Sequence, residues 1–266
     1  MTERLIRQLE AVLARQAPLT IAVSGGVDSM TLAVIAHRAL PGRVTVVHAI
    51  SPAVPRTATE RVRAYAEREG WTLITLDAGE FGDRRYRANP VDRCYFCKSN
   101  LYNRIRERTD DTIASGTNRD DLSDFRPGLK AAAEIGVVHP YVEAGIGKND
   151  IYAIAAALGL DDLATLPAQP CLASRVETGI AVKPADMEFV NDLEEALTPL
   201  VAAGEPLRVR IRRSGVAVEA GTPAKPGAMA EIEAIAGAAC AAQGRFFLGV
   251  SPYRRGSAFL HGAAHE

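Results

Sequence analysis

The segment that most constrains the fold is Ser-Gly-Gly-Val-Asp-Ser at residues 24–29. The preceding residues 19–23 form a short apolar run with β-branched side chains, which predicts a buried strand. Residues 30–40 contain no helix breaker and end before Pro41, so they predict a helix. A strand, a glycine-containing loop and a helix together form a phosphate-binding geometry, because backbone N–H groups and the positive end of the helix dipole face the anion.

The glycines and polar residues of this loop each have an expected role. Gly25 and Gly26 would let the backbone approach an anion, and Ser24 and Ser29 would add hydroxyl donors. The carboxylate of Asp28 would repel a phosphate unless a cation stood between them, so Asp28 implies Mg²⁺. The loop lacks the Gly-Lys-Ser/Thr ending of a Walker loop. It resembles the loop of the PP-loop ATP pyrophosphatases, which hold the pyrophosphate of ATP; an ordinary strand–helix turn is the alternative.

Further apolar segments alternate with helical ones in the first part of the chain. Strands are predicted at residues 44–49, 71–76 and 111–115, with helices at 57–69 and 99–108 between them. This alternation predicts an α/β fold with a doubly wound, mostly parallel sheet. Ligands bind such sheets at the carboxyl ends of the strands.

Two residues near those strand ends are candidates for nucleotide binding. His48 opens a segment whose backbone groups would contact adenine, and Gly116 would let the backbone approach the nucleotide. Both are otherwise ordinary loop residues. After residue 175 the pattern changes to a smaller α+β arrangement. We therefore expect an ATP-binding domain at residues 1–175 and a C-terminal domain at 176–266 that contacts substrate and supports oligomerisation.

Charge and composition exclude some classes of protein. The chain has 266 residues and a formal net charge of −1, so it has no broad basic surface for a long nucleic acid. No apolar run is long enough to span a membrane. The N-terminal residues predict an amphipathic helix and not a signal peptide, so we expect a cytoplasmic protein. Its 4 cysteines do not form a disulfide framework and are interpreted as metal ligands, reactive thiols or core residues.

Cys94 and Cys97 form a Cys-x-x-Cys pair that can face one metal ion or cluster. Zinc, an iron–sulfur cluster, a redox pair and structural thiols are all compatible with this spacing alone. The chain has no second Cys-x-x-Cys, so Cys171 is the obvious third ligand if folding brings it close. A [4Fe-4S] cluster with three cysteine ligands would leave one iron open to an exogenous ligand.

Cys171 also lies in a proline-bounded segment, Pro-Cys-Leu-Ala-Ser-Arg, that ends at Arg175. A positive charge beside a thiol favours the thiolate, so Cys171 is a candidate nucleophile with Arg175 as its partner. The alternative is a small buried apolar residue. We interpret Cys240, in an alanine-rich helical segment, as part of the core.

Residues 207–212 alternate strictly between apolar residues and arginines. Arg208, Arg210 and Arg212 would share one face of a strand, where their guanidinium groups suit a phosphate. A solvated strand face is the alternative. The segment Tyr-Arg-Arg-Gly-Ser from Tyr253 would add donors, including Arg255.

Longer segments carry a resemblance to the LarE family, the ATP-dependent sulfur transferases of nickel-pincer nucleotide synthesis. The similar segments cover nearly the whole chain and are SGGVDS from Ser24, HAISPAVP from His48, NPVDRCYFCKSNLY from Asn89, GTNRDDLSDFRPGLKAAAEIGV from Gly116, PCLASRVETG from Pro170, RVRI from Arg208 and YRRGS from Tyr253. Two positions depart from that family: Ser115, where aspartate is expected, and Ala258-Phe259, where small polar residues are expected.

The resemblance implies a reaction and its cofactors. ATP with Mg²⁺ would adenylylate a carboxylate of a pyridinium dicarboxylate mononucleotide, and a sulfur donor would displace AMP to leave a thiocarboxylate. In one branch of the family the cysteine at the Cys171 position gives up its sulfur and becomes dehydroalanine. In another branch three cysteines hold a [4Fe-4S] cluster that carries the sulfide, and Cys94, Cys97 and Cys171 match that branch. The expected partners are a small mononucleotide, with Arg208 and Arg210 on its phosphate, and further copies of the chain.

Other functions stay open from the sequence. A tRNA thiolase should have a basic RNA-binding extension, and an amide-forming ligase resembling NAD synthetase should have an ammonia source; neither is visible. A non-catalytic protein that binds a nucleotide or a cluster is an alternative of a different class.

Overall fold

The computed structural model describes residues 1–123, 127–254 and 256–258. The chain divides into two compact units, which we describe separately: residues 1–80 with 92–168, and residues 81–91 with the chain from 169 onward. The expected domain boundary at 175/176 therefore lies inside the second unit, which also takes up residues 81–91. No helix of the described residues is both long and apolar enough to cross a membrane.

The first unit contains a parallel sheet in the order β3-β2-β1-β4. Its strands are β1 (Leu19–Val23), β2 (Val44–Ala49), β3 (Thr72–Leu76) and β4 (Thr112–Ser115). The chain moves outward from β1 through β2 to β3 and then returns to the other side of β1. The strand order thus reverses between β1 and β4, the place where ligands bind in open parallel sheets.

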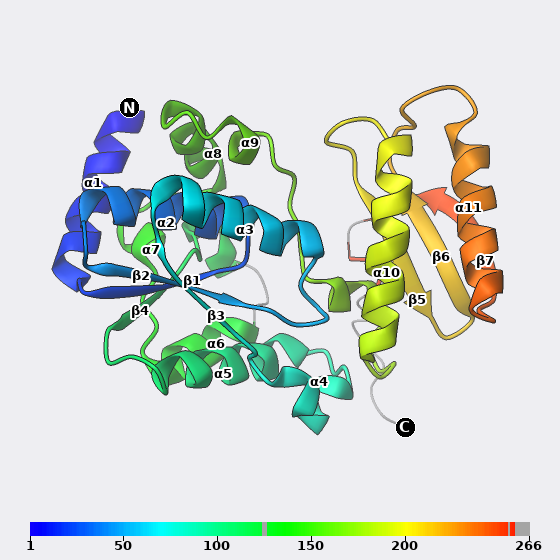
Figure 1. Ribbon diagram of the computed structural model, residues 1–266, viewed down its shortest axis with the longest axis horizontal. Coiled ribbons are helices and arrows are strands. Elements are labelled where there is room, and N and C mark those ends of the chain that lie inside the picture. Colours follow the sequence, from blue (N-terminus) through cyan, green and yellow to red (C-terminus); the bar gives the residue numbers. More distant parts are fainter. Residues whose placement is uncertain (124–126, 255, 259–266) are drawn as a thin grey trace. The chain divides into compact units, whose positions relative to one another are not determined.

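Helices cover both faces of this sheet (Figure 1), which is the predicted doubly wound α/β arrangement. Successive strand residues point to opposite faces, so Leu19 and Ile21 of β1 join one core cluster while Ala22 joins the other. Helices that pack on the first face are α1 (Thr2–Gln16), α2 (Val27–Ala39), α3 (Arg56–Glu69), α7 (Pro140–Glu143), α8 (Lys148–Ala157) and α9 (Asp161–Ala164). Helices that pack on the second face are α5 (Arg93–Arg106) and α6 (Pro127–Ile135).

The second unit contains a smaller sheet in the order β5-β6-β7. Its strands are β5 (Leu207–Arg212), β6 (Gly215–Ala220) and β7 (Phe247–Pro252), and α10 (Pro184–Leu197) and α11 (Ala228–Ala242) lie beside them (Figure 1). Strands β5 and β6 are antiparallel, whereas β6 and β7 are parallel. The one-turn helix α4 (Arg84–Arg87) joins this unit through the bond from the Val182 amide to the Arg87 carbonyl, 2.9 Å.

The remaining short elements are 3₁₀ turns: η1 (Glu80–Gly82), η2 (Arg119–Ser123), η3 (Leu172–Arg175) and η4 (Thr198–Leu200). Several boundaries differ from the sequence expectation. Helix α2 begins at Val27, three residues early, because the end of the glycine loop already forms its first turn. Helix α5 begins at Arg93, so the Cys-x-x-Cys pair lies on the helix and not before it. Beside β4, Ala114 forms a single bridge with Val138. Arg255, and residues 124–126 of the segment quoted from Gly116, lie outside the described residues.

Candidate active site

The loop of residues 24–29 lies at the carboxyl end of β1, and two glycines are required by its packing. Gly25 has φ +82°, and a Cβ there would lie 2.7 Å from the carbonyl oxygen of Ala58 on α3. A Cβ at Gly116, after β4, would lie 2.7 Å from the backbone nitrogen of Ser29. Gly116 therefore lets the end of β4 pack against the start of α2. Its approach to a nucleotide stays a prediction.

Two serines close the loop. The Ser29 hydroxyl accepts a hydrogen bond from the Ser24 amide at 3.0 Å and lies 3.3 Å from the Gly26 carbonyl oxygen, to which it donates. The Ser24 hydroxyl lies 3.3 Å from that of Ser29 and 3.4 Å from the Gly26 amide nitrogen. Ser29 is buried and Ser24 is exposed, so Ser24 presents the more accessible of the two hydroxyls. The first N–H groups of an α-helix have no intrahelical partner, and those of α2 follow directly.

The carboxylate of Asp28 pairs with Lys148, a residue that the sequence reasoning missed. The Lys148 Nζ lies 2.6 and 2.8 Å from the two carboxylate oxygens of Asp28. Burial raises the pKa of Asp28, although Lys148 acts in the opposite direction. The buried Tyr141 donates from its hydroxyl to the Asp28 carbonyl at 3.1 Å and so holds the backbone of this turn. The cation beside Asp28 in the fold is thus an ammonium group at the first turn of α8.

The residues at Asp28 suit Mg²⁺ only as an ion shared with a nucleotide. No group of three or more His, Cys, Asp or Glu side chains in the described part of the chain is arranged to hold a metal. Mg²⁺ is commonly held by one or two carboxylates together with substrate phosphates, and Asp28 supplies such a carboxylate. Lys148 would then share Asp28 with the ion or turn to the phosphates.

His48 serves the fold through its side chain. Its Nδ1 lies 3.0 Å from the Val23 carbonyl oxygen, and its Nε2 lies 2.9 Å from the Thr59 hydroxyl. Because a carbonyl only accepts, Nδ1 carries the proton and Nε2 accepts from Thr59. Burial lowers the pKa of His48, which favours this neutral form. The ring therefore ties the ends of β1 and β2 to α3, and only its backbone could contact adenine.

A second polar group lies at the end of β4. The Ser115 hydroxyl is 2.9 Å from His139 Nδ1 and 3.1 Å from the Thr117 hydroxyl. Burial, and next the charge of Lys98, lower the pKa of His139. Ser115 is the position at which the LarE family is expected to have aspartate, and here it is a hydrogen-bonding neighbour of a histidine.

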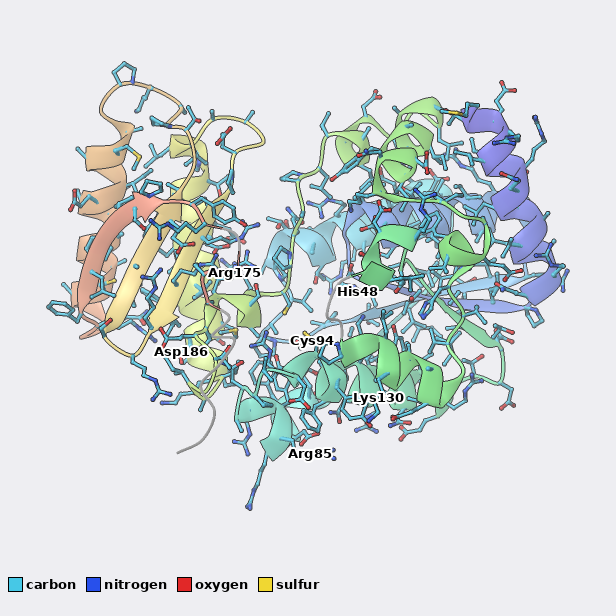
Figure 2. All side chains as sticks on the ribbon, turned by 180° about the vertical axis from the view of Figure 1, so that it is seen from behind. His48, Arg85, Cys94, Lys130, Arg175 and Asp186 are labelled. Carbon is cyan, nitrogen blue, oxygen red and sulfur yellow. The ribbon has the colours of Figure 1, made fainter. Side chains whose placement is uncertain are left out.

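Cys94, which Figure 2 labels, lies at the start of α5 in the first unit, and Cys97 follows one helical turn later. Cys94 is exposed and Cys97 is half-buried. Lys98 follows Cys97 directly on α5, and its electrostatic interaction with Tyr102 raises its pKa against the effect of burial, with smaller contributions from Cys97 and Cys94. These two cysteines can supply two thiolates to one ligand.

Cys171 is exposed at the start of η3 in the second unit, so the alternative of a buried apolar residue is wrong. The expected effect of Arg175 on the Cys171 thiol stays a prediction, and the hydrogen bonds of Arg175 go to α10 and to the backbone. Its guanidinium donates to both carboxylate oxygens of Glu194 at 3.0 and 2.8 Å, and to the carbonyls of Pro170 and Cys171 at 2.6 and 3.0 Å. The contacts of Arg175 therefore fix the backbone around Cys171 and join it to α10. Cys240 is fully buried, as expected for a core residue.

The arginines of β5 are not a solvated ladder. Glu219 of β6 accepts from Arg210 Nε at 2.9 Å and from Arg212 Nη2 at 2.8 Å. Arg210 and Glu219 are only 4% and 1% exposed. Arg208 is half-buried, and its guanidinium lies 6.0 Å from the ring centre of Tyr253. Burial, followed by the charge of Arg175, lowers the pKa of Arg208.

Comparison with known proteins finds relatives that match part of the chain. The chain is 35% identical over 178 residues to an uncharacterised protein from Synechocystis sp., an alignment that covers 65% of this chain and 66% of that protein. It is 31% identical over 158 residues to the pyridinium-3,5-bisthiocarboxylic acid mononucleotide synthase of Lactiplantibacillus plantarum, over 57% of each chain. It is 28% identical over 158 residues to one subunit of the glutamine-hydrolysing GMP synthase of Methanopyrus kandleri, over 53% of this chain and 50% of that one.

These similarities support the PP-loop family. The alignments span between half and two thirds of these relatives. No protein-family model matches the chain.

Proposed function

We propose that the protein is an ATP-dependent sulfur transferase that forms AMP and pyrophosphate and converts the carboxylates of a pyridinium-3,5-dicarboxylate mononucleotide to thiocarboxylates. The observation that carries this proposal is the loop at the switch point of the parallel sheet, which packs closely on its neighbours through Gly25 and Gly116 and bears the Asp28–Lys148 pair. The similarity to the mononucleotide synthase of Lactiplantibacillus plantarum supports the choice of substrate.

The residues of the loop suit the first chemical step. The substrate carboxylate oxygen attacks the α-phosphorus of ATP, and the bond to pyrophosphate breaks. Backbone N–H groups of the loop and the start of α2 would bind the departing pyrophosphate. The Lys148 ammonium, next to Asp28, would stabilise negative charge that develops on the phosphates.

In the second step a sulfur nucleophile attacks the acyl carbon of the adenylate, and AMP leaves with its bonding electron pair. If Cys171 is the donor, a thioester forms. Loss of the Cys171 Cα proton then breaks its Cβ–S bond and leaves dehydroalanine and a thiocarboxylate. This route consumes one cysteine per transfer and needs no oxidant.

The alternative source is a sulfide carried by a [4Fe-4S] cluster. When bound by three thiolates, such a cluster supplies a fourth iron that can hold an exogenous sulfide. Cys94 and Cys97 fit as two ligands because they are accessible on one helical turn. Cys171 belongs to the other unit, so its place as the third ligand stays a prediction.

The second unit offers a basic cluster for the substrate phosphate. Four guanidinium groups (Arg175, Arg208, Arg210 and Arg212) accompany two carboxylates (Glu194 and Glu219), so positive charge is in excess. We propose that Arg208 and Arg210 bind the mononucleotide phosphate as parts of this cluster. Arg210 would then contact the phosphate while it stays paired with Glu219, and not as a solvent-exposed side chain.

Mass spectrometry of the protein after anaerobic turnover tests the sulfur source. If the cluster route operates, Cys171 keeps its mass, and alanine at Cys94, Cys97 or Cys171 removes both bound iron and sulfur transfer. Dehydroalanine at Cys171, together with retained activity in Cys94→Ala and Cys97→Ala, would establish the sacrificial route and contradict the cluster as donor. The buried Cys240 is the matched control, because Cys240→Ser should affect neither iron content nor transfer.

The similarity to the GMP synthase subunit favours one second candidate, a ligase that adenylylates its substrate and then uses ammonia. In such a ligase, ammonia and not sulfur would attack the adenylylated substrate. Incubating the enzyme with ATP, the mononucleotide and either ammonium or sulfide distinguishes the two candidate functions, since only the proposed transferase yields a thiocarboxylate.

A further inference from the structure

Helix α3 contacts the phosphate loop through side chains that share one face of that helix. Ala58 lies against Gly25, where a Cβ on the glycine would be 2.8 Å from the Ala58 Cβ. Arg61, three residues later on the same face, donates from Nη1 to the Gly25 carbonyl oxygen at 2.7 Å. Gly25 is therefore held in its left-handed conformation from two sides, by close packing and by a charge-assisted hydrogen bond.

Arg61 belongs to a charged network on the outer side of the loop. The Tyr65 hydroxyl, one turn further along α3, donates to Asp162 Oδ1 of α9 at 2.6 Å. Burial lowers the pKa of Arg61, while Asp162 and then Tyr65 oppose that effect. Burial and the bond to Asp162 raise the pKa of Tyr65 to about 12. The guanidinium is thus a half-buried cation whose surroundings are set by α3 and α9.

The direction in which the Gly25 carbonyl points affects how well the loop can bind an anion. A loop binds phosphate when its N–H groups converge on the anion, and a carbonyl oxygen directed at the same place would repel it. We infer that Arg61 is a positioning residue for the phosphate loop, holding the Gly25 carbonyl to the α3 side and adding a positive charge beside the polyphosphate. This inference rests on the proposed function, because it assumes that the loop binds the polyphosphate of ATP.

Calorimetric titration of the full chain with inorganic pyrophosphate tests this role. In Arg61→Gln, pyrophosphate affinity should fall about tenfold and the KM for ATP should rise by a similar factor, because both the carbonyl anchor and the charge are lost. AMP affinity should change by less than about twofold, since AMP lacks the pyrophosphate. Arg61→Lys should recover most of the pyrophosphate affinity, and added salt should narrow the difference between wild type and Arg61→Gln.

Arg63→Gln is the matched control, because it removes the same charge from an exposed position of α3. If Arg61→Gln and Arg63→Gln bind pyrophosphate equally well, the inference is wrong. An equal loss of AMP and pyrophosphate affinity with a lower melting temperature would make Arg61 a stabilising residue only, which also overturns it. A wild-type protein that binds neither pyrophosphate nor ATP would instead contradict the proposed function.

Discussion

In Asp28→Asn, the rate of pyrophosphate release should fall about 100- to 1,000-fold, comparable to the loss of other groups that stabilise transition-state charge. The amide side chain is neutral, so it neither holds Mg²⁺ on the nucleotide nor orients the Lys148 ammonium 2.6 Å away. The fold should survive, because Tyr141 bonds to the Asp28 backbone and not to its carboxylate. A fluorescent or coupled assay of released pyrophosphate measures the effect.

Asp77→Asn provides a matched control, since Asp77 is an exposed carboxylate just after β3 and caps the Gly79 amide at 2.8 Å. Its pyrophosphate release should stay within about twofold of wild type, as expected for a surface substitution. Unchanged release in Asp28→Asn would remove Asp28 from the site. Combining Asp28→Asn with Lys148→Met separates the two roles of Asp28. If Asp28→Asn still changes the Mg²⁺ concentration needed for activity when Lys148 is absent, the carboxylate is a Mg²⁺ ligand.

Glu219→Gln should lower the free energy of unfolding of the protein by about 3–5 kcal/mol, because it leaves the buried guanidinium of Arg210 without its carboxylate. The same change weakens the bond from Arg212. Added phosphate should raise the melting temperature of Glu219→Gln more than that of wild type, since an anion can replace the lost charge. Urea and thermal unfolding measure both effects.

Glu231→Gln is the control for this prediction, because Glu231 pairs with Lys225 at 3.2 Å in the same unit but both side chains are largely exposed. That pair should contribute less than about 1 kcal/mol. A cost below about 1 kcal/mol for Glu219→Gln would mean that the arginines of β5 do not depend on Glu219. Those arginines could then bind an external phosphate even when Glu219 is replaced.

The elements that sequence reasoning predicted well are those with a local pattern. The loop at residues 24–29, the four strands of the parallel sheet and the β5 strand follow from apolar runs, glycines and alternation within a few residues. Helix α6 and the one-turn helices were missed, because helices of 9 and 4 residues offer few turns in which a period can be recognised.

The partners of the charged residues could not be predicted in the same way. Lys148 reaches Asp28 across 120 residues of sequence, and a lysine at the start of a helix such as α8 carries no sign of that partner. Arg175 was expected beside the Cys171 thiol, but Glu194 takes its guanidinium once α10 packs on η3. Arg210 was expected on an open face, but the antiparallel pairing of β5 with β6 brings Glu219 beside it. Ion pairs of this kind depend on tertiary packing, which alternation within one strand does not record.

The measurement that tests the central claim most directly uses a mononucleotide whose carboxylate oxygens are labelled with oxygen-18. The enzyme is incubated with this substrate, Mg²⁺, ATP and a sulfur source, and the products are analysed by ³¹P NMR and mass spectrometry. If a carboxylate oxygen attacks the α-phosphorus, the products are pyrophosphate, a thiocarboxylate and AMP that carries one labelled oxygen. AMP without the label, or ADP with inorganic phosphate, would contradict adenylylation of the carboxylate.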